Sequence, residues 1–241
     1  MFRTGILPHQ NDYSPDGRLI FNGSLGRLEK PFRENHKKGD RQITVVDATT
    51  LKPVRTYKFD AGVRPTVFTK DGTTMYAQLS YLNGVIKFDL QKDDPRKPGA
   101  IVNKLSRERS DWSKKTYKDE DAFPHNSAHH GLAMSGDETL LCDCATVEDR
   151  VWIVSTADLS VQGIVDLAVD PPGKALSVPY WATTSADGNH CIVSLSGVDQ
   201  IAVINFRTAQ LTRKVPVGDF PQRNRLGRLA DEAIRNLTRT P

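Results

Sequence analysis

SADGNHCIVSLS, residues 185–196, is the stretch that decides the fold, because its pattern occurs four times along the chain. In each copy a Gly/Asp turn is followed at once by a short strand of mostly apolar residues. The other copies are SPDGRLIFNGSL from Ser14, TKDGTTMYAQLS from Thr69 and MSGDETLLCDCA from Met134. In this alignment Gly136-Asp137 of the third copy takes the place of the Asp-Gly pair. The chain is therefore built from repeats.

A second module follows each copy and carries another strand, which ends on a small polar residue. The modules read QITVVDATTLKPVRTYKF, GVIKFDLQ, RVWIVSTADLSVQGIVDL and QIAVINFRTAQLTRKVPV. The closing residues are Asp47, Asp89, Ser155 and Asn205. In the last three repeats 18 or 19 residues separate the turn from its closing residue, against 31 in the first, where a polar insertion intervenes. This near-constant spacing indicates one structural unit.

Repeats of about 45 residues with several β-rich runs and turn signals are typical of propeller blades. The sequence therefore predicts an all-β fold, a β-propeller of four-stranded antiparallel blades with about four blades present. The expected blades cover about residues 5–68, 69–133, 134–184 and 185–229. In each blade the inner strand precedes the turn and the outer strand comes last. Apolar residues at helical spacing in LGRLADEAIRNL, residues 226–237, predict a short C-terminal helix in the tail 230–241.

The Asp-Gly turns together with VVDATTLKPVRT and VPVGDFPQR resemble the repeats of YVTN-type bacterial β-propellers, which are similar to surface-layer and WD-repeat propellers. The resemblance covers residues 5–228 and departs in the third repeat and in two insertions. It implies the fold and little about function, since one fold hosts many activities. Such propellers are often exported, so the resemblance implies a periplasmic or extracellular parent, although the start of this chain has no signal peptide.

Propellers of this type usually close with seven blades, whereas four are counted here. We therefore expect the chain to be the C-terminal part of a longer propeller. A small closed ring of four blades and the pairing of two arcs are the alternatives. An open arc would expose strand edges, which promote self-association.

The net charge of +4 comes from two polar insertions, residues 26–42 and 91–122. We expect residues 91–122 to form a mobile loop between blades two and three, with a frayed outer strand around residues 100–104. No contiguous basic face with aromatic partners is evident, so nucleic acid is not an expected partner. No apolar run reaches about 18 residues, so no membrane span is expected.

Three cysteines are too few, and odd in number, for a disulfide framework. Cys142 and Cys144 are two apart and would point to the same face of a strand. We expect buried free thiols at both positions and at Cys191. A metal clip of the two neighbouring cysteines is less favoured, because no further cysteine completes a ligand set.

The stretch PHNSAHHGLAM, residues 124–134, holds three of the six histidines and starts the third blade. The starts of the inner strands should surround the mouth of the central channel. The residues expected to form this ring are His9, Arg64, His129, Tyr180 and Gln222. His130, Trp181 and Arg223 are expected one residue deeper or to the side.

Three interpretations of this ring remain open. Its polar residues could bond strand ends and channel water. They could bind a small polar or anionic ligand, with Arg64 and Arg223 as charge partners and Trp181 as a wall. They could hold a divalent metal ion through His9, His129 or His130, since imidazole is a common metal ligand. Neighbouring histidines in a strand point in opposite directions, so only one of His129 and His130 should reach the axis.

The sequence contains no Ser-His-Asp arrangement, phosphate loop or HExxH motif. We therefore expect a non-catalytic binding or scaffold propeller, whose partner is a small polar or anionic ligand or another protein. The alternative is a metal-dependent hydrolase that uses the channel histidines, by analogy with propeller lactonases.

Overall fold

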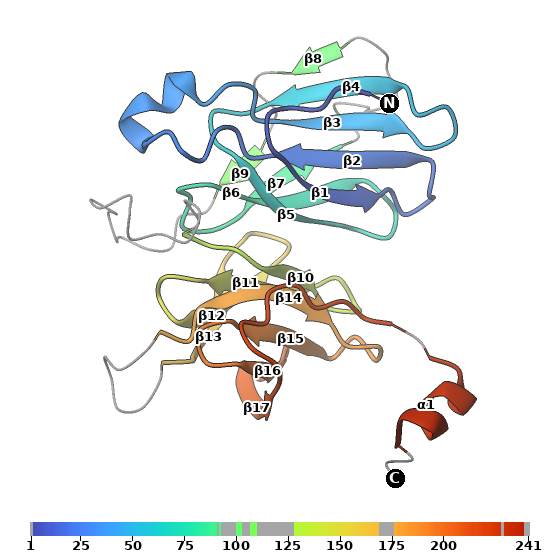
Figure 1. Ribbon diagram of the computed structural model, residues 1–241, viewed down its shortest axis with the longest axis vertical. Coiled ribbons are helices and arrows are strands. Elements are labelled where there is room, and N and C mark those ends of the chain that lie inside the picture. Colours follow the sequence, from blue (N-terminus) through green and yellow to red (C-terminus); the bar gives the residue numbers. More distant parts are fainter. Residues whose placement is uncertain are drawn as a thin grey trace.

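The computed structural model describes residues 2–90, 92, 100–102, 107–109, 128–168, 176–227 and 229–238. Its strands form four sheets, arranged as two pairs that lie one above the other in Figure 1. Each sheet is one blade of four antiparallel strands from the channel outward, and one of the sheets carries a fifth strand at its outer edge. The all-β propeller fold with four-stranded blades is therefore confirmed.

The four blades follow one another along the chain. Blade one consists of β1 (Pro8–Tyr13), β2 (Leu19–Ser24), β3 (Gln42–Asp47) and β4 (Pro53–Lys58). Blade two consists of β5 (Val63–Phe68), β6 (Thr74–Leu79), β7 (Ile86–Asp89) and β9 (Arg107–Arg109). Blade three consists of β10 (Leu132–Met134), β11 (Leu140–Ala145), β12 (Arg150–Ser155) and β13 (Val161–Asp166). Blade four consists of β14 (Pro179–Thr184), β15 (His190–Leu195), β16 (Gln200–Asn205) and β17 (Gln210–Pro216).

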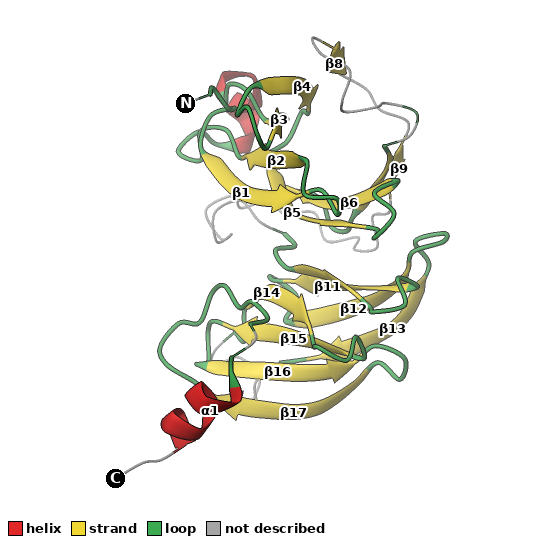
Figure 2. Ribbon diagram, turned by 90° about the vertical axis from the view of Figure 1, so that its right-hand side faces the viewer, coloured by secondary structure: helices red, strands yellow, loops and turns green. Residues whose placement is uncertain are grey.

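The inner strands β1, β5, β10 and β14 precede the turns, as predicted. The expected blade bounds at residues 69, 134 and 185 each fall one strand too late, because the strand before each turn pairs with the strand after it. A 3-10 helix, Phe32–Lys37, lies in the first insertion. The predicted C-terminal helix is α1 (Asp231–Thr238), which lies outside the sheets (Figure 2). In the described part of the chain no helix is long and apolar enough to cross a membrane.

One part of the second insertion belongs to a different blade from the one expected. The strand β8 (Ala100–Val102) pairs in parallel with β4 at the outer edge of blade one. The outer strand of blade two is β9, which follows later in the chain. The prediction of a blade-two strand around residues 100–104 is therefore wrong, because the open backbone groups of β4 take this segment. The predicted mobility concerns residues of which most lie outside the described ranges.

One aspartate holds each turn between the first two strands of a blade. Its carboxylate accepts hydrogen bonds from a hydroxyl two residues earlier and from the backbone N–H two residues later. These aspartates are Asp16, Asp71, Asp137 and Asp187. The next residue has a φ between 63° and 76°, which glycine adopts most readily; these residues are Gly17, Gly72, Glu138 and Gly188. Our alignment of the third copy is therefore wrong by one residue, because Asp137 is the turn aspartate and Glu138 replaces the glycine.

Gly136 serves the packing of two blades. A Cβ atom at this position would lie 2.7 Å from the Cα atom of Gly188, in the turn of blade four. The Gly136 N–H also donates a hydrogen bond to the Gly188 carbonyl at 2.9 Å. The turns of blades three and four therefore touch backbone to backbone, which requires glycine on both sides.

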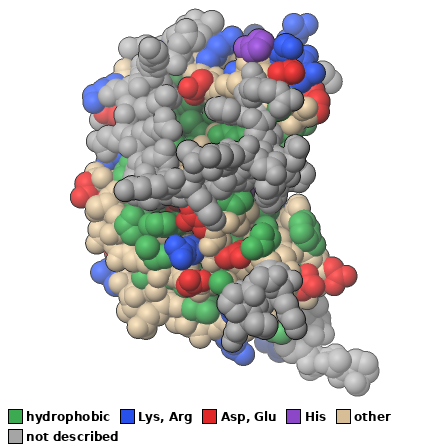
Figure 3. Space-filling model, turned by 90° about the vertical axis from the view of Figure 1, so that its left-hand side faces the viewer, with side chains coloured by type: hydrophobic (Ala, Val, Ile, Leu, Met, Phe, Trp, Pro, Cys, Tyr) green, Lys and Arg blue, Asp and Glu red, His purple; other side chains and the backbone are tan. Residues whose placement is uncertain are grey.

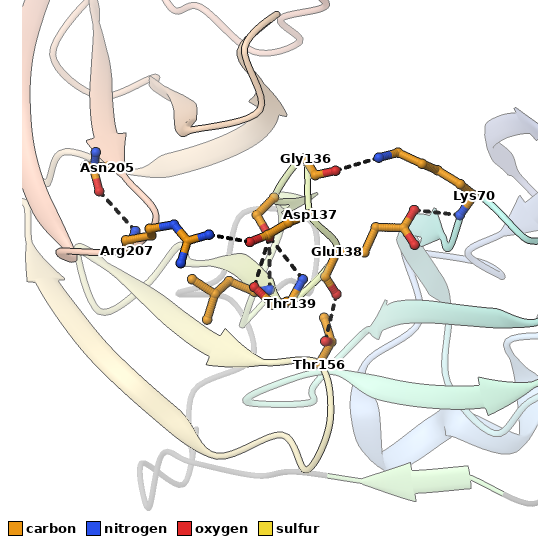
Figure 4. A network of polar contacts seen from close by, with 10 residues as sticks. Lys70, Gly136, Asp137, Glu138, Thr139, Thr156, Asn205 and Arg207 are labelled. Atoms are coloured by element: carbon orange, nitrogen blue, oxygen red, sulfur yellow. Dashed lines mark hydrogen bonds and ion pairs between the residues drawn. The ribbon is translucent and has the colours of Figure 1, made fainter.

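Charged side chains join the turn of blade three to both of its neighbours (Figure 4). Arg207 of blade four donates through Nη2 to Asp137 Oδ2 at 2.8 Å. From blade two, the backbone N–H of Lys70 donates to Glu138 Oε1 at 2.6 Å, and its Nζ donates to the Gly136 carbonyl. Blades two, three and four are thus linked on the turn side of the molecule.

Apolar side chains fill the spaces between neighbouring blades. The cluster of blades one and two, here called the aromatic seam, contains Phe21, Tyr57, Phe59 and Phe88. The cluster of blades three and four, here called the cysteine seam, contains Cys142, Cys144, Cys191, Ala133, Ala182, Ala202 and Phe206. A smaller cluster of blades two and three includes Tyr76, Val85, Leu141 and Trp152. The core is therefore distributed among the seams.

The cysteines differ from the prediction. Cys142 on β11 and Cys191 on β15 form a disulfide that joins blades three and four. Cys144 is a free, buried thiol, and burial, reinforced by the neighbouring Asp143, raises its pKa well above the ordinary value. The expectation of three free thiols is wrong because Cys191 is 49 residues from Cys142 in sequence, and only the packing of the blades brings them together.

Charges of both signs are interspersed on the face shown in Figure 3, where red and blue side chains adjoin over the lower half of the molecule. This half contains blades three and four. The described part of this face therefore presents no large region of one charge.

Candidate functional site

The starts of the inner strands surround a cavity of about 330 Å³, here called the mouth cavity. Its described lining consists of Leu7, Pro8, His9, Leu25, Leu28, Arg64, His130, Tyr180, Gln222 and Arg223. Six of the eight residues singled out in the sequence are therefore brought together. The two that do not line it are His129 and Trp181.

His130 lies at the centre of the contacts in the mouth cavity. Its ring stacks on the ring of Tyr180 with a centroid distance of 4.2 Å, and its Nδ1 contacts the Tyr180 carbonyl at 2.9 Å. Its Nε2 lies 3.2 Å from Nε2 of His9. Burial, the charge of Arg64 and the nearness of His9 hold the pKa of His130 well below its ordinary value. The imidazole of His130 is therefore neutral at neutral pH.

Arg64 brings a buried cation to the same cavity. Its side chain on β5 is 1% exposed, and its Nε donates to Ser80 Oγ at 3.0 Å. Burial lowers the pKa of Arg64 to about 10, against the opposing effect of Tyr180 and Tyr81. The guanidinium still carries its charge at neutral pH. A charge placed in this way makes the cavity attractive to anions.

The residues that follow β17 complete the mouth cavity. This C-terminal strap, residues 221–227, crosses from blade four toward blade one. Ser196 Oγ donates to the Pro221 carbonyl, just as Thr146 Oγ1 of blade three donates to the carbonyl of Pro179. The predicted correspondence of Pro221-Gln222 with Pro179-Tyr180 therefore has a structural basis.

The strap also places two arginines around Trp181. The guanidinium carbons of Arg223 and Arg225 lie 4.7 and 4.6 Å from the centre of its ring. Nη2 of Arg223 donates to the His9 carbonyl at 2.9 Å, which ties the strap to β1. Cation–π contacts of this kind orient an arginine without neutralising its charge. Arg223 thus remains available to an anion in the mouth cavity.

His129 points away from the mouth cavity, so its expected place in the ring is wrong. Its Nδ1 lies 2.7 Å from Asp143 Oδ2, and both side chains are fully buried. Asp143 Oδ1 also accepts a hydrogen bond from Gln78 Nε2. Neighbouring residues of an extended chain point in opposite directions, and the carboxylate of Asp143 decides which histidine turns inward. His130, which we expected to the side, takes the place at the cavity.

The donor atoms of the mouth cavity do not fit a divalent metal ion. The two Nε2 atoms of His9 and His130 converge, but within the described ranges no group of three His, Cys, Asp or Glu residues could hold a metal. Arg64 and Arg223 line the same cavity and would repel a cation. His129, the third expected ligand, is held by Asp143.

A second cavity, of about 510 Å³ and here called the inner chamber, lies further along the inner strands. Trp181 and Arg225 line it, together with Gln10, Asp12 and Thr66. Asp12 Oδ2 accepts hydrogen bonds from Thr66 Oγ1 at 2.5 Å and from Gln10 Nε2. Burial raises the pKa of Asp12, and its hydrogen bonds and Arg225 only partly offset this effect.

Asp12 was not among the predicted site residues, because no carboxylate aligns with it in the other repeats. Its position three residues after His9 on the same inner strand was the available signal.

A larger cavity, about 640 Å³, lies on the turn side between blades two, three and four. Its charged lining includes Lys70, Asp137, Glu138 and Arg207, which pair with one another or with backbone groups. These charges serve to join the blades. The mouth cavity and the inner chamber are therefore the better candidates for a functional site.

No protein-family model and no curated protein sequence matches this chain. Among solved structures, 1126 chains match it significantly. One is the periplasmic gluconolactonase PpgL of Pseudomonas aeruginosa, with a TM-score of 0.60 and 16% sequence identity, over 87% of this chain and 57% of that chain. This chain thus spans little more than half of the length of the gluconolactonase. At this identity the likeness establishes that the chain has a β-propeller fold, and membership of the YVTN-type family remains a prediction.

Proposed function

We propose that this protein binds a small anionic ligand, a carboxylate or a phosphate ester, in the mouth cavity. The observation that carries the proposal is the charge of the lining: Arg64 and Arg223 are present, and no Asp or Glu occurs among its described residues. A volume of about 330 Å³ suits a small metabolite.

The arrangement of the two arginines supports recognition of an anion. Arg64 is held rigidly inside blade two, whereas Arg223 lies on the strap and is oriented by Trp181 and the His9 carbonyl. A buried guanidinium gains most from an anion, because little water competes for its donors. The neutral ring of His130 and the face of Tyr180 would form an uncharged wall beside the ligand.

The same geometry favours binding over catalysis. His129 and Asp143 have the arrangement of a catalytic base and its orienting carboxylate. However, both side chains are fully buried, and they line neither the mouth cavity nor the inner chamber. The contact of His130 Nδ1 with the Tyr180 carbonyl serves to fix its ring.

The second candidate function is hydrolysis of a cyclic ester. The contact between His9 Nε2 and His130 Nε2 favours this candidate, because the neutral imidazole of His130 then lies in a cavity that also holds two arginines. In this reaction water adds to the ring carbonyl and the ring C–O bond breaks, which yields a hydroxy acid. Arg64 and Arg223 would stabilise the oxyanion and then the product carboxylate. The gluconolactonase among the solved structures gives this candidate an analogy in the same fold.

We also infer that the protein works in an oxidising compartment outside the cytosol. The Cys142–Cys191 disulfide supports this inference, since such bonds are rare in reducing compartments. The periplasmic source of the gluconolactonase agrees with it.

Calorimetric titration with inorganic phosphate, acetate and gluconate at low salt tests the binding function. We expect saturable binding of at least one of these anions, weakened about 10- to 100-fold by Arg223→Gln, since a hydrogen bond to a charged group contributes about 1.5–3 kcal/mol. Arg213→Gln, which removes an exposed arginine on β17, is the matched control and should bind as the unchanged protein does. Absence of saturable binding, or equal affinity of both variants, would refute the proposal.

Proton release from glucono-δ-lactone, followed at constant pH, separates the two candidate functions. Hydrolysis that depends on His130 and is lost in His130→Gln would favour the enzyme.

Metal analysis of the protein, with His9→Ala as the comparison, examines the metal-dependent alternative directly. Stoichiometric metal that this substitution removes would contradict our assessment of the donor set.

A further inference from the structure

We infer that the inner chamber is a second binding site, which takes a neutral ring compound whose hydroxyl group donates a hydrogen bond to Asp12. This site is separate from the mouth cavity, and its ligand is of a different chemical class. The inference does not depend on the function proposed above.

The first step concerns the free capacity of Asp12. Both hydrogen bonds to its carboxylate, from Thr66 Oγ1 and Gln10 Nε2, reach the same oxygen, Oδ2. Within the described residues Oδ1 accepts no hydrogen bond, and it is not one of the buried unsatisfied atoms, so it is open to the chamber. Asp12 thus offers a fixed acceptor to a donor inside the chamber.

Gln10 holds the Asp12 carboxylate in place through its Nε2. Its side chain is 5% exposed, and its Oε1 has no hydrogen-bond partner among the described residues. Buried acceptors of this kind carry a cost unless a donor satisfies them. Gln10 Oε1 is enclosed and out of reach of a ligand, so the Asp12 carboxylate supplies the side-chain acceptor on this wall.

Charges of both signs line the chamber, so neither a cation nor an anion meets a lining of uniformly opposite charge. The carboxylate of Asp12 repels an anion, while Lys70 and Arg225 in the same lining repel a cation. A neutral donor avoids both penalties. Burial raises the pKa of Asp12, and a hydrogen bond from a ligand would favour its charged form.

The remaining lining favours a flat apolar body. Trp181, Phe68, Tyr13, Leu132 and Met134 line the chamber around the polar wall. Aromatic and thioether side chains pack well against rings. The volume of about 510 Å³ lies within the range of small-molecule sites.

The test compares 4-fluorophenol with its methyl ether, 4-fluoroanisole, in fluorine NMR titrations. We expect fluorophenol to bind about tenfold more tightly than fluoroanisole, which has no hydroxyl proton to donate. Asp12→Ala should remove this preference and leave the affinity for fluoroanisole unchanged. Because a misfolded variant would lose both probes, the difference between them reports on the hydrogen bond.

Two controls locate the site. Arg213→Gln, an exposed position on β17 that lines neither cavity, should leave the affinities for both probes unchanged. Inorganic phosphate should not displace fluorophenol. Equal affinity of the two probes for the unchanged protein, a retained preference in Asp12→Ala, or displacement by phosphate would each overturn the inference.

Discussion

The aromatic seam between blades one and two and the cysteine seam between blades three and four join the same kind of sheet by different means. In the first, Phe59 and Phe88 meet edge to face with a centroid distance of 5.5 Å. In the second, alanines and cysteines let the sheets approach closely, and the Cys142–Cys191 disulfide crosses between them. The first seam is stabilised by buried area, whereas the second is stabilised by close packing and a covalent bond.

The difference shows which positions the repeat pattern constrains. Turn aspartates and closing residues recur in every blade, because their hydrogen bonds lie within a few residues of sequence. Residues in the seams contact another blade, so each pair of blades can satisfy the demand for close packing with its own side chains. Repetition therefore describes the blades well and the contacts between them poorly.

The largest expected effect comes from emptying the aromatic seam. Phe88 is 1% exposed, and Phe88→Ala should lower the free energy of unfolding by about 3–5 kcal/mol, through lost burial and the cavity left behind. Denaturant unfolding measures this change in free energy, and hydrogen exchange of the backbone amides shows which blades are destabilised. Exchange should accelerate mainly in blades one and two.

Phe206→Ala is the matched variant in the cysteine seam, since Phe206 is also 1% exposed. It should accelerate exchange mainly in blades three and four. Identical exchange patterns in the two variants would show that the four blades unfold as one unit and that the two seams do not stabilise separate parts of the molecule.

Removal of the disulfide examines the cysteine seam. Cys142→Ala combined with Cys191→Ala should cost about 2–5 kcal/mol, because the bond no longer restricts the unfolded chain. Reducing agent should destabilise the unchanged protein and have no further effect on the double variant. Cys144→Ala, which keeps the disulfide, should cost less.

A thiol titration in denaturant without reductant gives an independent check. One free thiol per chain is expected from the structure. Three free thiols would show that all three cysteines are reduced, as the sequence predicted, and that no covalent bond distinguishes the cysteine seam from the aromatic seam.

The smallest effect concerns pH and the ionic link beside the cysteine seam. Hydrogen bonds from Ser135 and Thr139, with a smaller contribution from Arg207, lower the pKa of Asp137 to about 2. An unfolded aspartate has a pKa of about 3.9. Because the folded value is the lower one, the stabilisation is complete above the unfolded pKa and is lost as pH falls from about 4 through 2.

Asp137→Asn should therefore lose less stability over this range of pH than the unchanged protein. Asp71→Asn is the matched variant, because Asp71 holds the equivalent turn of blade two through Thr69 and Thr73. Melting curves between pH 2 and 5 measure both. Equal pH responses of the two variants would indicate that the turn carries the effect and that the contact of Arg207 with Asp137 adds nothing.

Much of the fold was predictable because its determinants are local. The strands follow apolar runs, and the turns follow an aspartate that accepts from a hydroxyl two residues before it. The misalignment at Gly136 shows the limit of this reasoning. The closing residue Ser155 lies 18 residues from Asp137, which is the spacing of the second and fourth repeats. The role of Gly136 is a contact with Gly188 of blade four, and only the structure revealed it.

The candidate site was predictable in its place and less so in its members. The register of the inner strands brought His9, Arg64 and Tyr180 to one cavity, because each is the second residue of a six-residue inner strand. Which of the two adjacent histidines faces that cavity depends on Asp143, 14 residues from His129. No pattern in the repeats signals that contact.

The sequence by itself determined the blades, their order and the position of the channel mouth, since these follow from strand period and turn chemistry within each repeat. The tertiary structure alone decided the Cys142–Cys191 disulfide, the pairing of β8 with blade one and the inward turn of His130. Each of these depends on groups that are distant in sequence and meet only when one blade packs on another.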